Sequence, residues 1–188
     1  RCLWRCNSNF PGEHFSVVLL TTRNEETFKF YKMSKYREQV DKYLFNTISE
    51  NYAEKDIYPV SKIARAFQVE CMIDFISKEF NVKHAKNIIE VGCGHGANSE
   101  YLEELYDNYL GIDYSEELVR IASKRYGNFK TKFVVDNIKE IDKYGRFDIV
   151  IGIGILHHVD NIEEVLLKLK EIGHENTLYL FYAPKRGN

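Results

Sequence analysis

Three glycines at alternate positions, Gly92, Gly94 and Gly96, follow a run of largely β-branched residues at 87–91. Glycine lets the backbone turn sharply and approach a ligand closely, and the helix after such a turn offers its amide-rich end. From residue 86 onward, apolar runs alternate with amphipathic segments, which predicts strands followed by helices. This alternation indicates an α/β fold, a doubly wound and mainly parallel sheet with helices on both faces. Ligands of such sheets bind outside the carboxyl ends of the strands, where the glycines stand.

The pattern gives the expected elements in detail. Strands are expected at residues 87–91, 108–112, 132–135, 147–151 and 178–182, and helices from about residues 98, 115 and 160. Ser115 is expected to cap the second of these helices, because acidic residues follow it and basic residues end the segment before Gly127. Asp160 and Glu163 resemble a capping box at the start of the third helix.

The first 85 residues have a different pattern. Apolar side chains recur at helical spacing over 36–48 and 63–80, which predicts two helices, and residues 15–21 predict a strand. We therefore divide the chain into an extension or remnant of a preceding domain (1–33), a helical cap or lid (34–85) and a ligand-binding core (86–188).

Composition excludes several classes of function. The chain has 26 basic and 28 acidic residues, so no basic excess indicates nucleic-acid binding. No apolar run reaches the roughly 20 residues of a membrane span, and the start lacks the apolar core of a signal peptide. Cys2 and Cys6 have no second Cys/His pair at ligand spacing, so no metal site is expected. Unpaired thiols predict a cytoplasmic protein.

The glycine loop by itself fits two ligands. Gly92, Gly94 and Ala97 also satisfy the dinucleotide fingerprint, whose third small residue can be alanine. Glu90, two positions before the first glycine, separates the two ligands, because a carboxylate there attracts a cationic amine and repels a pyrophosphate. Cys93 lies inside the loop, where a small residue fits and no activating base is nearby.

Acidic residues follow the next two strands. Asp113, with Tyr114 beside it, is placed to accept hydrogen bonds from ribose hydroxyls; its alternative role is that of a turn residue before the next helix. Asp136 and Asn137 are placed to hold adenine through a carboxylate and a backbone amide, and their alternative role is a simple turn.

The fourth strand ends in small residues and two histidines. Gly152 and Ile153 would leave room for donor and acceptor beside the site. His157 or His158 would serve as a general base, since imidazole titrates near neutrality, and the alternative for each is packing or solvent exposure.

Taken in order, these motifs make residues 86–184 resemble the class I, Rossmann-like methyltransferase family. The motifs are the glycine loop with Glu90, then Asp113 and Asp136, and the segment 156–159, which resembles that of the family's small-molecule branch. The resemblance implies strand order 3-2-1-4-5, bound S-adenosylmethionine and methyl transfer by in-line displacement. Residues 45–52 resemble the helix and tyrosine that precede the glycine loop in many members, which implies that Tyr52 closes over the cofactor; its alternative role is ordinary packing. The family usually continues into two antiparallel strands after the fifth, so we expect either a truncated chain or a short sheet with an exposed edge.

We therefore predict a small-molecule O-, N- or C-methyltransferase. An NAD-dependent oxidoreductase shares the glycines and Asp113 but leaves Glu90 and Asp136 unexplained, and a non-catalytic module that binds S-adenosylmethionine is the other alternative. Residues 17–36 also faintly resemble the closing strand and helix of a GNAT-type acetyltransferase, which would make this chain the junction of two domains.

Overall fold

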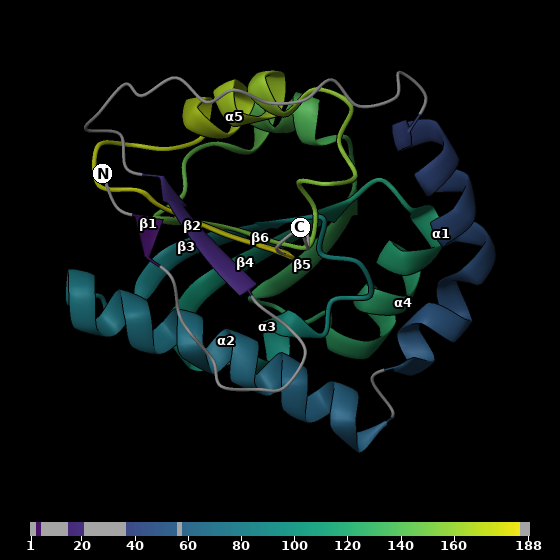
Figure 1. Cartoon of the computed structure of the whole chain (residues 1–188), viewed down its shortest axis with the longest axis horizontal. Helices are drawn as coiled ribbons and strands as arrows, with labels where there is room; N and C mark the ends of the chain where they lie inside the picture. The colour runs from purple at the N-terminus through teal and green to yellow at the C-terminus, as the bar shows by residue number, and fades with distance from the viewer. Residues whose placement is uncertain (1–2, 5–14, 21–36, 56–57, 185–188) are drawn as a thin grey trace.

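The computed structural model describes residues 3–4, 15–20, 37–55 and 58–184. At its centre lies a seven-stranded sheet in the order β1-β2-β7-β6-β3-β4-β5 (Figure 1). The strands are β1 (Leu3–Trp4), β2 (Phe15–Leu20), β3 (Ala85–Val91), β4 (Tyr106–Asp113), β5 (Thr131–Val135), β6 (Ile149–Ile153) and β7 (Leu178–Pro184). The five strands from β5 to β7 pair in parallel, which confirms the predicted α/β fold and its 3-2-1-4-5 order, counted from the strand before the glycine loop.

The edge of β7 differs from the expectation. Strand β2 pairs with β7 in antiparallel register, from Phe15 opposite Pro184 to Leu20 opposite Tyr179, and β1 pairs with β2. The expected exposed edge at the fifth strand is therefore wrong, because an upstream strand satisfies its backbone groups. The predicted strand at 15–21 is confirmed for residues 15–20. The segment compared with an acetyltransferase falls mostly on residues 21–36, outside the described residues.

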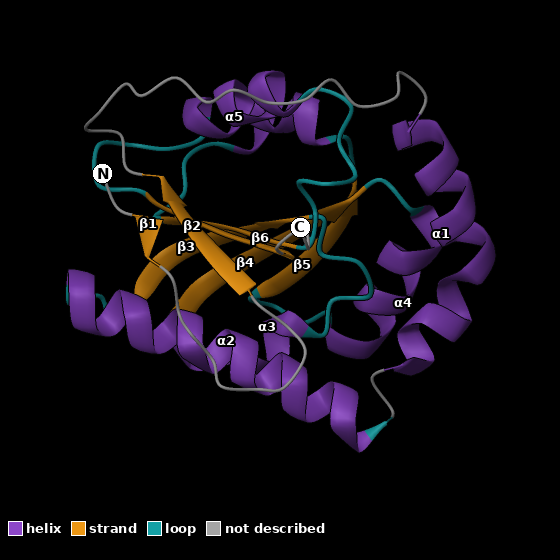
Figure 2. Ribbon diagram, viewed as in Figure 1, coloured by secondary structure: helices purple, strands orange, loops and turns teal. Residues whose placement is uncertain are grey.

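Helices cover both faces of the sheet (Figure 2). They are α1 (Arg37–Glu54), α2 (Pro59–Phe80), α3 (Asn98–Tyr101), α4 (Glu116–Tyr126) and α5 (Ile162–Glu171), with 3₁₀ helices η2 (Glu103–Leu105) and η3 (Ile138–Tyr144). On one face α2 and α4 bury apolar side chains such as Met72 and Val119 against the sheet. On the other, α5 and η3 bury Leu169 and Ile141. These two cores fix the sheet whose carboxyl edge carries the predicted motifs. No helix of the described residues is long and apolar enough to cross a membrane.

Two helices differ locally from the prediction. The helix after the glycine loop is a single turn, α3, because only nine residues separate Gly96 from the start of β4 at Tyr106. Ser115 caps α4 as predicted, accepting a hydrogen bond from the Leu118 amide. The cap of α5 is Asn161, which accepts from the Glu164 amide, so the predicted capping role of Asp160 is wrong. Asp160 instead binds α1, as described below.

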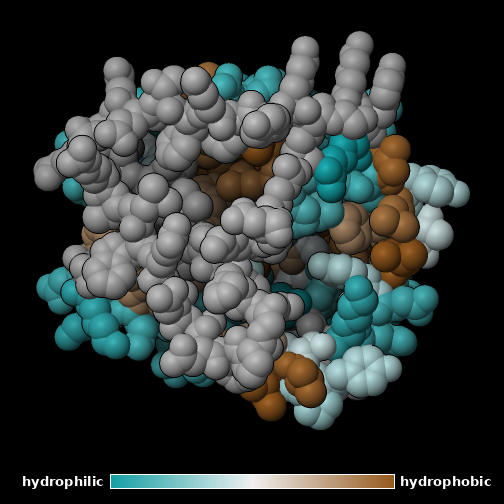
Figure 3. All heavy atoms as spheres, in the orientation of Figure 1, coloured by the Kyte–Doolittle hydropathy of each residue, from teal (hydrophilic) through white to brown (hydrophobic). Residues whose placement is uncertain are grey.

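Helix α1 buries few of its side chains against the rest of the protein. Only Ser49 and Ala53 of this helix are buried, and Val40 is 61% exposed. Figure 3 shows apolar side chains at the surface over α1 and over the start of α2, where Val60 and Ile63 are also exposed. With so small a buried apolar face, α1 depends on polar contacts for its position.

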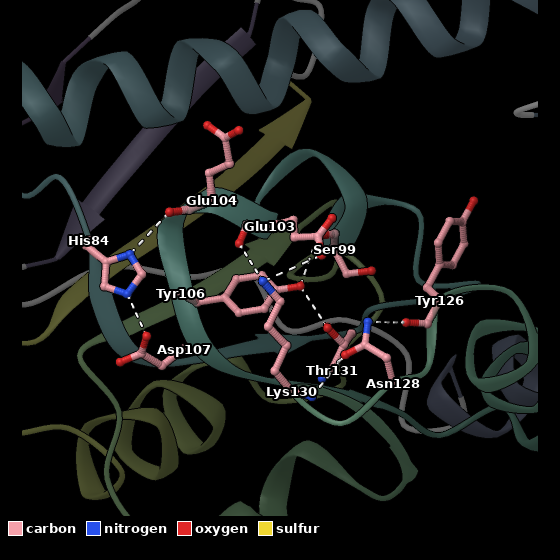
Figure 4. Close-up of polar contacts among 10 residues, drawn as sticks. All are labelled: His84, Ser99, Glu103, Glu104, Tyr106, Asp107, Tyr126, Asn128, Lys130 and Thr131. Carbon is pink, nitrogen blue, oxygen red and sulfur yellow. Dashed lines mark hydrogen bonds and ion pairs between the residues drawn. The ribbon is translucent and has the colours of Figure 1, made fainter.

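Polar side chains tie the amino ends of the strands together (Figure 4). The buried Tyr106 hydroxyl bonds the Ser99 carbonyl at 3.2 Å and the Thr131 hydroxyl at 2.9 Å. His84, just before β3, bonds the Asp107 carboxylate at 2.9 Å and the Glu104 carbonyl at 3.2 Å. We call this set the amino-end cluster; its members are His84, Ser99, Glu104, Tyr106, Asp107 and Thr131. It joins β3, β4, β5 and α3 at the edge opposite the glycine loop.

Candidate functional site

The glycine loop folds tightly at the carboxyl end of β3. Gly92, Gly94 and Gly96 all have positive φ, between 55° and 82°, where L side chains are strained. The amides of Gly92 and Cys93 donate to the Ile112 carbonyl at 2.8 and 3.0 Å, which ties the loop to β4. A Cβ at Gly96 would lie 2.8 Å from Ala122 and Phe133 atoms, and one at Gly92 would overlap Ile155. The loop therefore requires glycine at both positions.

Asp113 lies buried beside this loop at the end of β4. One carboxylate oxygen accepts the Gly94 amide and the other accepts the Ser115 amide, each at 2.9 Å. Burial raises the pKa of Asp113, opposed by these two amides and by the charge of His158. The residue thus holds the turn before α4, its alternative role. The Tyr114 amide also lowers this pKa, so the carboxylate keeps part of its acceptor capacity for a ligand hydroxyl.

Two adjoining cavities of about 400 and 380 Å³ open at this edge and share Asp113, Tyr114, Gly92, Ile155 and His158. Their combined lining comes from β4 and β6, from the segments that follow β3, β4, β5 and β6, and from α1. We call the two together the groove. The Tyr114 hydroxyl is buried without a partner in the described structure, and such a group is available to a ligand.

Asp136 and Asn137 line the first cavity. Burial alone would raise the pKa of Asp136, but hydrogen bonds from Lys143 and Tyr144 outweigh it and lower the pKa. Its carboxylate also accepts the Asn137 amide at 2.8 Å. The Asn137 side chain caps η3 through the Lys139 amide, so its turn role is present as well.

Glu90 lines neither cavity. Its carboxylate is fully buried and accepts hydrogen bonds from the Asn98 amide and the Tyr109 hydroxyl. Burial raises the pKa of Glu90 to about 7, although both donors oppose the shift. Cys93 beside it is buried, and burial raises the pKa of its thiol well above the ordinary value, so the thiol is not a nucleophile.

Tyr52 of α1 lies over the glycine loop and lines the second cavity. Its ring meets those of Phe45 and His95 edge to face, at 5.3 and 5.7 Å between centroids. The nearest atom to a Cβ placed at Gly94 is a Tyr52 ring carbon at 3.8 Å. The structure thus brings together the predicted lid residue and the predicted loop.

Strand β6 ends at the groove. A Cβ at Gly152 would overlap Phe181 and Ile155, so glycine is needed there for packing, while Ile153 lines the second cavity. Gly154 has a φ of 70° and its amide donates to the Tyr182 carbonyl at 2.8 Å. This turn was not predicted from the sequence, although two glycines two positions apart, Gly152 and Gly154, indicate one.

The two histidines that follow have different surroundings. His158 lines both cavities, and its Nδ1 lies 2.7 Å from the Asp41 carboxylate. His157 lines neither cavity, and its Nδ1 is buried without a partner in the described structure. Burial lowers the pKa of His157, and the neighbouring charges of His158 and Arg37 lower it further.

Helix α1 is bound to this segment through its first turn. Asp160 accepts the Arg37 amide at 3.1 Å and the Glu38 amide at 3.4 Å, and the Glu38 carboxylate accepts the Asp160 amide at 3.0 Å. Farther along, Asn46 accepts the Ser115 hydroxyl at 2.7 Å. The sequence analysis missed Glu38, Asp41 and Asn46, and no sequence signal could have found them, since their partners lie at least 69 positions away.

Within the described part of the chain, no group of three or more His, Cys, Asp or Glu side chains could hold a metal ion. Cys2 and Cys6 lie outside the described residues, whereas the buried Cys93 is a free thiol.

Comparison with known proteins identifies similar chains. A family model described as "Methyltransferase domain" matches residues 89–177. The ubiquinone biosynthesis O-methyltransferase of Rickettsia felis is 26% identical over 133 residues, which cover 69% of this chain and 54% of that protein. The chain thus spans about half the length of the curated relatives it matches.

Solved structures show the same fold. A structure titled "DhpI-SAH complex structure" has a TM-score of 0.64 and 18% identity, covering 79% of this chain and 70% of that one. The plantazolicin methyltransferase BpumL, solved with a desmethylPZN analogue and SAH, has a TM-score of 0.59 and 25% identity, covering 73% of this chain and 54% of that one.

Proposed function

We propose that this chain, which belongs to the class I (Rossmann-like) S-adenosylmethionine-dependent methyltransferase family, transfers a methyl group to an oxygen, nitrogen or carbon of a small molecule. The observation that carries the proposal is the groove, where the glycine loop, Asp113 and Asp136 meet at the carboxyl edge of the sheet. The family match gives no support to the alternative of an NAD-dependent oxidoreductase.

The residues of the groove fit the adenosine half of S-adenosylmethionine. Asp113 keeps acceptor capacity for the ribose hydroxyls, and the Tyr114 hydroxyl beside it needs a partner. Asp136 would accept the adenine amine, and the backbone at Asn137 would reach a ring nitrogen. A side chain at Gly92 or Gly96 would collide with its neighbours, so both positions need glycine for the loop to keep this conformation.

The methionine half would lie against the glycine loop. Gly94 and Cys93 would contact it through their backbone, and Tyr52 would cover it from α1. Glu90 would act from behind the loop by holding the side chains of Asn98 and Tyr109. Gly152 and Ile153 would leave room beside the methyl group, and His157 or His158 would take the acceptor's proton.

When bound, S-adenosylmethionine supplies a methyl group already activated by its sulfonium. The protein's own contribution is then to align the acceptor, exclude water and remove a proton where the nucleophile carries one. The apolar residues of the groove, such as Ile112 and Ile155, would help to exclude water.

Calorimetric titration tests cofactor binding. We expect S-adenosylmethionine and S-adenosylhomocysteine to bind and NADH not to bind; heat with NADH alone would overturn the proposal. Asp113→Asn should weaken S-adenosylhomocysteine binding about 10- to 100-fold, because an amide replaces a charged acceptor. The matched control is Asp107→Asn in the amino-end cluster, which should leave affinity unchanged. An equal loss of S-adenosylhomocysteine affinity in both variants would show that the ligand does not bind at Asp113.

Transfer is tested separately. The protein is incubated with labelled S-adenosylmethionine and cell extract, and the methylated compound is identified. Label in a small molecule supports the proposal, whereas label only in protein or nucleic acid contradicts the proposed acceptor class. Binding without any turnover would make the chain a non-catalytic module.

We also propose a cytoplasmic location, supported by the free thiol of Cys93, which is typical of a reducing compartment. Fractionation of cells that produce the protein tests this; recovery in a secreted or periplasmic fraction would contradict it.

A further inference from the structure

His158 carries a carboxylate partner from a distant part of the chain. Its Nδ1 lies 2.7 Å from Oδ2 of Asp41 in α1, and the two side chains are 22% and 14% exposed. Both come from elements that border the groove, and His158 lines both of its cavities. The pair is therefore shielded from water yet in contact with the space open to a ligand.

This contact selects one tautomer of the imidazole. An ionised carboxylate accepts hydrogen bonds and cannot donate, so Nδ1 must carry the proton. The other ring nitrogen, Nε2, then has its lone pair free to accept a proton from a substrate. A carboxylate on Nδ1 also stabilises the imidazolium that forms when Nε2 takes that proton.

His157 lacks these properties. It contributes to neither cavity, and its Nδ1 is buried without a partner in the described structure. Its ring lies 4.0 Å from that of His158, so an imidazolium at His157 would repel one at His158. Of the two histidines, His158 is the one placed to act as a base.

Other charged and titratable groups face the pair from each neighbouring element. From α1, Arg37 lies 3.5 Å from Asp41, and Glu38 lines the first cavity. From β4 and the turn after it, Asp113 and Tyr114 border both cavities. Phe45 of α1 packs edge to face on the His158 ring at 5.4 Å. Apart from Arg37 and His157, these groups are acidic or neutral.

The pair exists only while α1 is docked. The reciprocal bonds between Asp160 and the first turn of α1 hold that turn, and Lys139 bonds Glu38 at 3.1 Å. Since α1 buries little apolar surface, these contacts decide whether Asp41 reaches His158. The same helix carries Tyr52 over the glycine loop.

We infer that Asp41 is a positioning residue that fixes His158 as the general base for a hydroxyl acceptor, and that docking of α1 assembles this pair. The acceptor's O–H proton passes to Nε2 of His158 and its oxygen forms a bond to the methyl carbon. The carbon–sulfur bond of the donor breaks, its electron pair stays on sulfur, and the proton on His158 later leaves to water. The inference rests on the proposed function and narrows its acceptor to compounds with an ionisable hydroxyl, such as phenols and enols.

The first test reads the tautomer without any substrate. The full chain is labelled with ¹⁵N-histidine, and long-range ¹H–¹⁵N spectra are recorded with S-adenosylhomocysteine present. We expect the Nδ1–H form of His158 in the wild type and a shift toward the Nε2–H form in Asp41→Asn, whose amide can donate to Nδ1. Glu50→Gln is the control, an acid-to-amide change on the exposed side of the same helix, paired with Arg120. An unchanged His158 tautomer in Asp41→Asn would overturn the inference.

A second variant tests the role of docking. Asp160→Ala removes the acceptor for the first turn of α1 and leaves Asp41 in place. We expect the same tautomer shift at His158 as in Asp41→Asn. A wild-type spectrum in Asp160→Ala would contradict the assembly of the pair by docking.

The third test uses the compound that the labelling experiment identifies. At pH 7, Asp41→Asn should lower kcat about 100-fold, the usual contribution of a general base, with KM little changed. The loss should shrink as pH rises, because the acceptor hydroxyl then ionises by itself; a merely structural role would give a loss independent of pH. Methyl transfer to nitrogen or carbon alone would overturn the acceptor class, whereas failure to bind S-adenosylhomocysteine would instead overturn the proposed function.

Discussion

The two ends of the parallel sheet are built differently. In the amino-end cluster, polar side chains find partners among themselves: Tyr106 with Ser99 and Thr131, and His84 with Asp107. At the carboxyl end, the Tyr114 hydroxyl lines the groove and is buried without a partner in the described structure. Buried polar groups are normally paired within the protein, and the Tyr179 hydroxyl near the start of β7 is another such exception, but it lines neither cavity. The amino-end cluster therefore serves stability, and the carboxyl end holds bonding capacity for a ligand at Tyr114.

Backbone conformation differs in the same way. Four of the five glycines with positive φ in the described residues, Gly92, Gly94, Gly96 and Gly154, lie at the carboxyl end, and the fifth is Gly145 in the loop before β6. Asn81, before β3, is the only non-glycine with positive φ in the described residues. Tight glycine turns gathered at the carboxyl edge of a parallel sheet are typical of ligand sites. The following predictions test this division, from the largest expected effect to the smallest.

Gly96→Ala should have the largest effect. The new Cβ would lie 2.8 Å from Ala122 and Phe133 at a φ of 82°, so the loop must move. We expect a loss of roughly 3 kcal/mol or more in the free energy of unfolding, measured in urea, and loss of measurable S-adenosylhomocysteine binding.

The matched control for this variant is Gly145→Ala. Its φ of 91° carries a similar backbone strain, but a Cβ there has no neighbour within 4 Å. It should cost about 1–3 kcal/mol, from the backbone conformation alone, and leave affinity unchanged. Equal effects of the two variants would show that backbone strain alone, and not the packing of the loop, decides the outcome.

Glu90→Gln should change how stability depends on pH. Burial raises the pKa of Glu90 to about 7, above its value in the unfolded chain, so the folded state holds its proton more tightly. Between about pH 4.5 and 7 the wild type therefore loses stability as pH rises, by roughly 2–3 kcal/mol in total.

Urea unfolding at pH 5 and pH 8 checks this prediction. The glutamine variant keeps a neutral group and should have a flatter profile over this range than the wild type. Parallel profiles would show that Glu90 ionises in the folded state as readily as in the unfolded chain.

Tyr106→Phe tests the amino end. The variant loses the hydroxyl that bridges Ser99 and Thr131 and should unfold about 1–2 kcal/mol more easily in urea. Cofactor affinity should stay unchanged, because the groove lies at the opposite edge. Tyr43→Phe on α1, whose tyrosine is 76% exposed, should cost nothing measurable. A loss of affinity in Tyr106→Phe would contradict the division between the two ends.

His84→Gln should have the smallest effect. The hydrogen bond to Asp107, and then that to the Glu104 carbonyl, raise the pKa of His84. The stabilisation is therefore complete below the unfolded pKa, near 6.5, and is lost as pH rises through the folded value. The Tm of the wild type should slightly exceed that of the variant at pH 5.5 and equal it at pH 8.5. A larger difference in Tm at pH 8.5 than at pH 5.5 would contradict the stabilising role assigned to the hydrogen bond between His84 and Asp107.

Most features that depend on residues close together in the chain were predicted correctly from the sequence. The five parallel strands, the glycine loop and the Ser115 cap follow from alternation, from positive φ and from a side chain beside its own helix. The cap of α5 was misplaced by one residue, because Asp160 and Asn161 are both good caps and only the docking of α1 distinguishes them. The contact between Asp41 and His158 spans 117 positions and depends on how α1 packs, which no periodicity encodes.

The pairing of β2 with β7 affects how this chain is made. Phe15 must find Pro184, near the other end of the described chain. Contacts between distant segments form slowly, because closing a long loop costs entropy before the contact repays it. On the ribosome, β2 therefore leaves the exit tunnel long before its partner and must wait until β7 is synthesised. During that interval its backbone needs protection from other strands, so we expect the yield of folded protein to depend on chaperones and on the rate of synthesis.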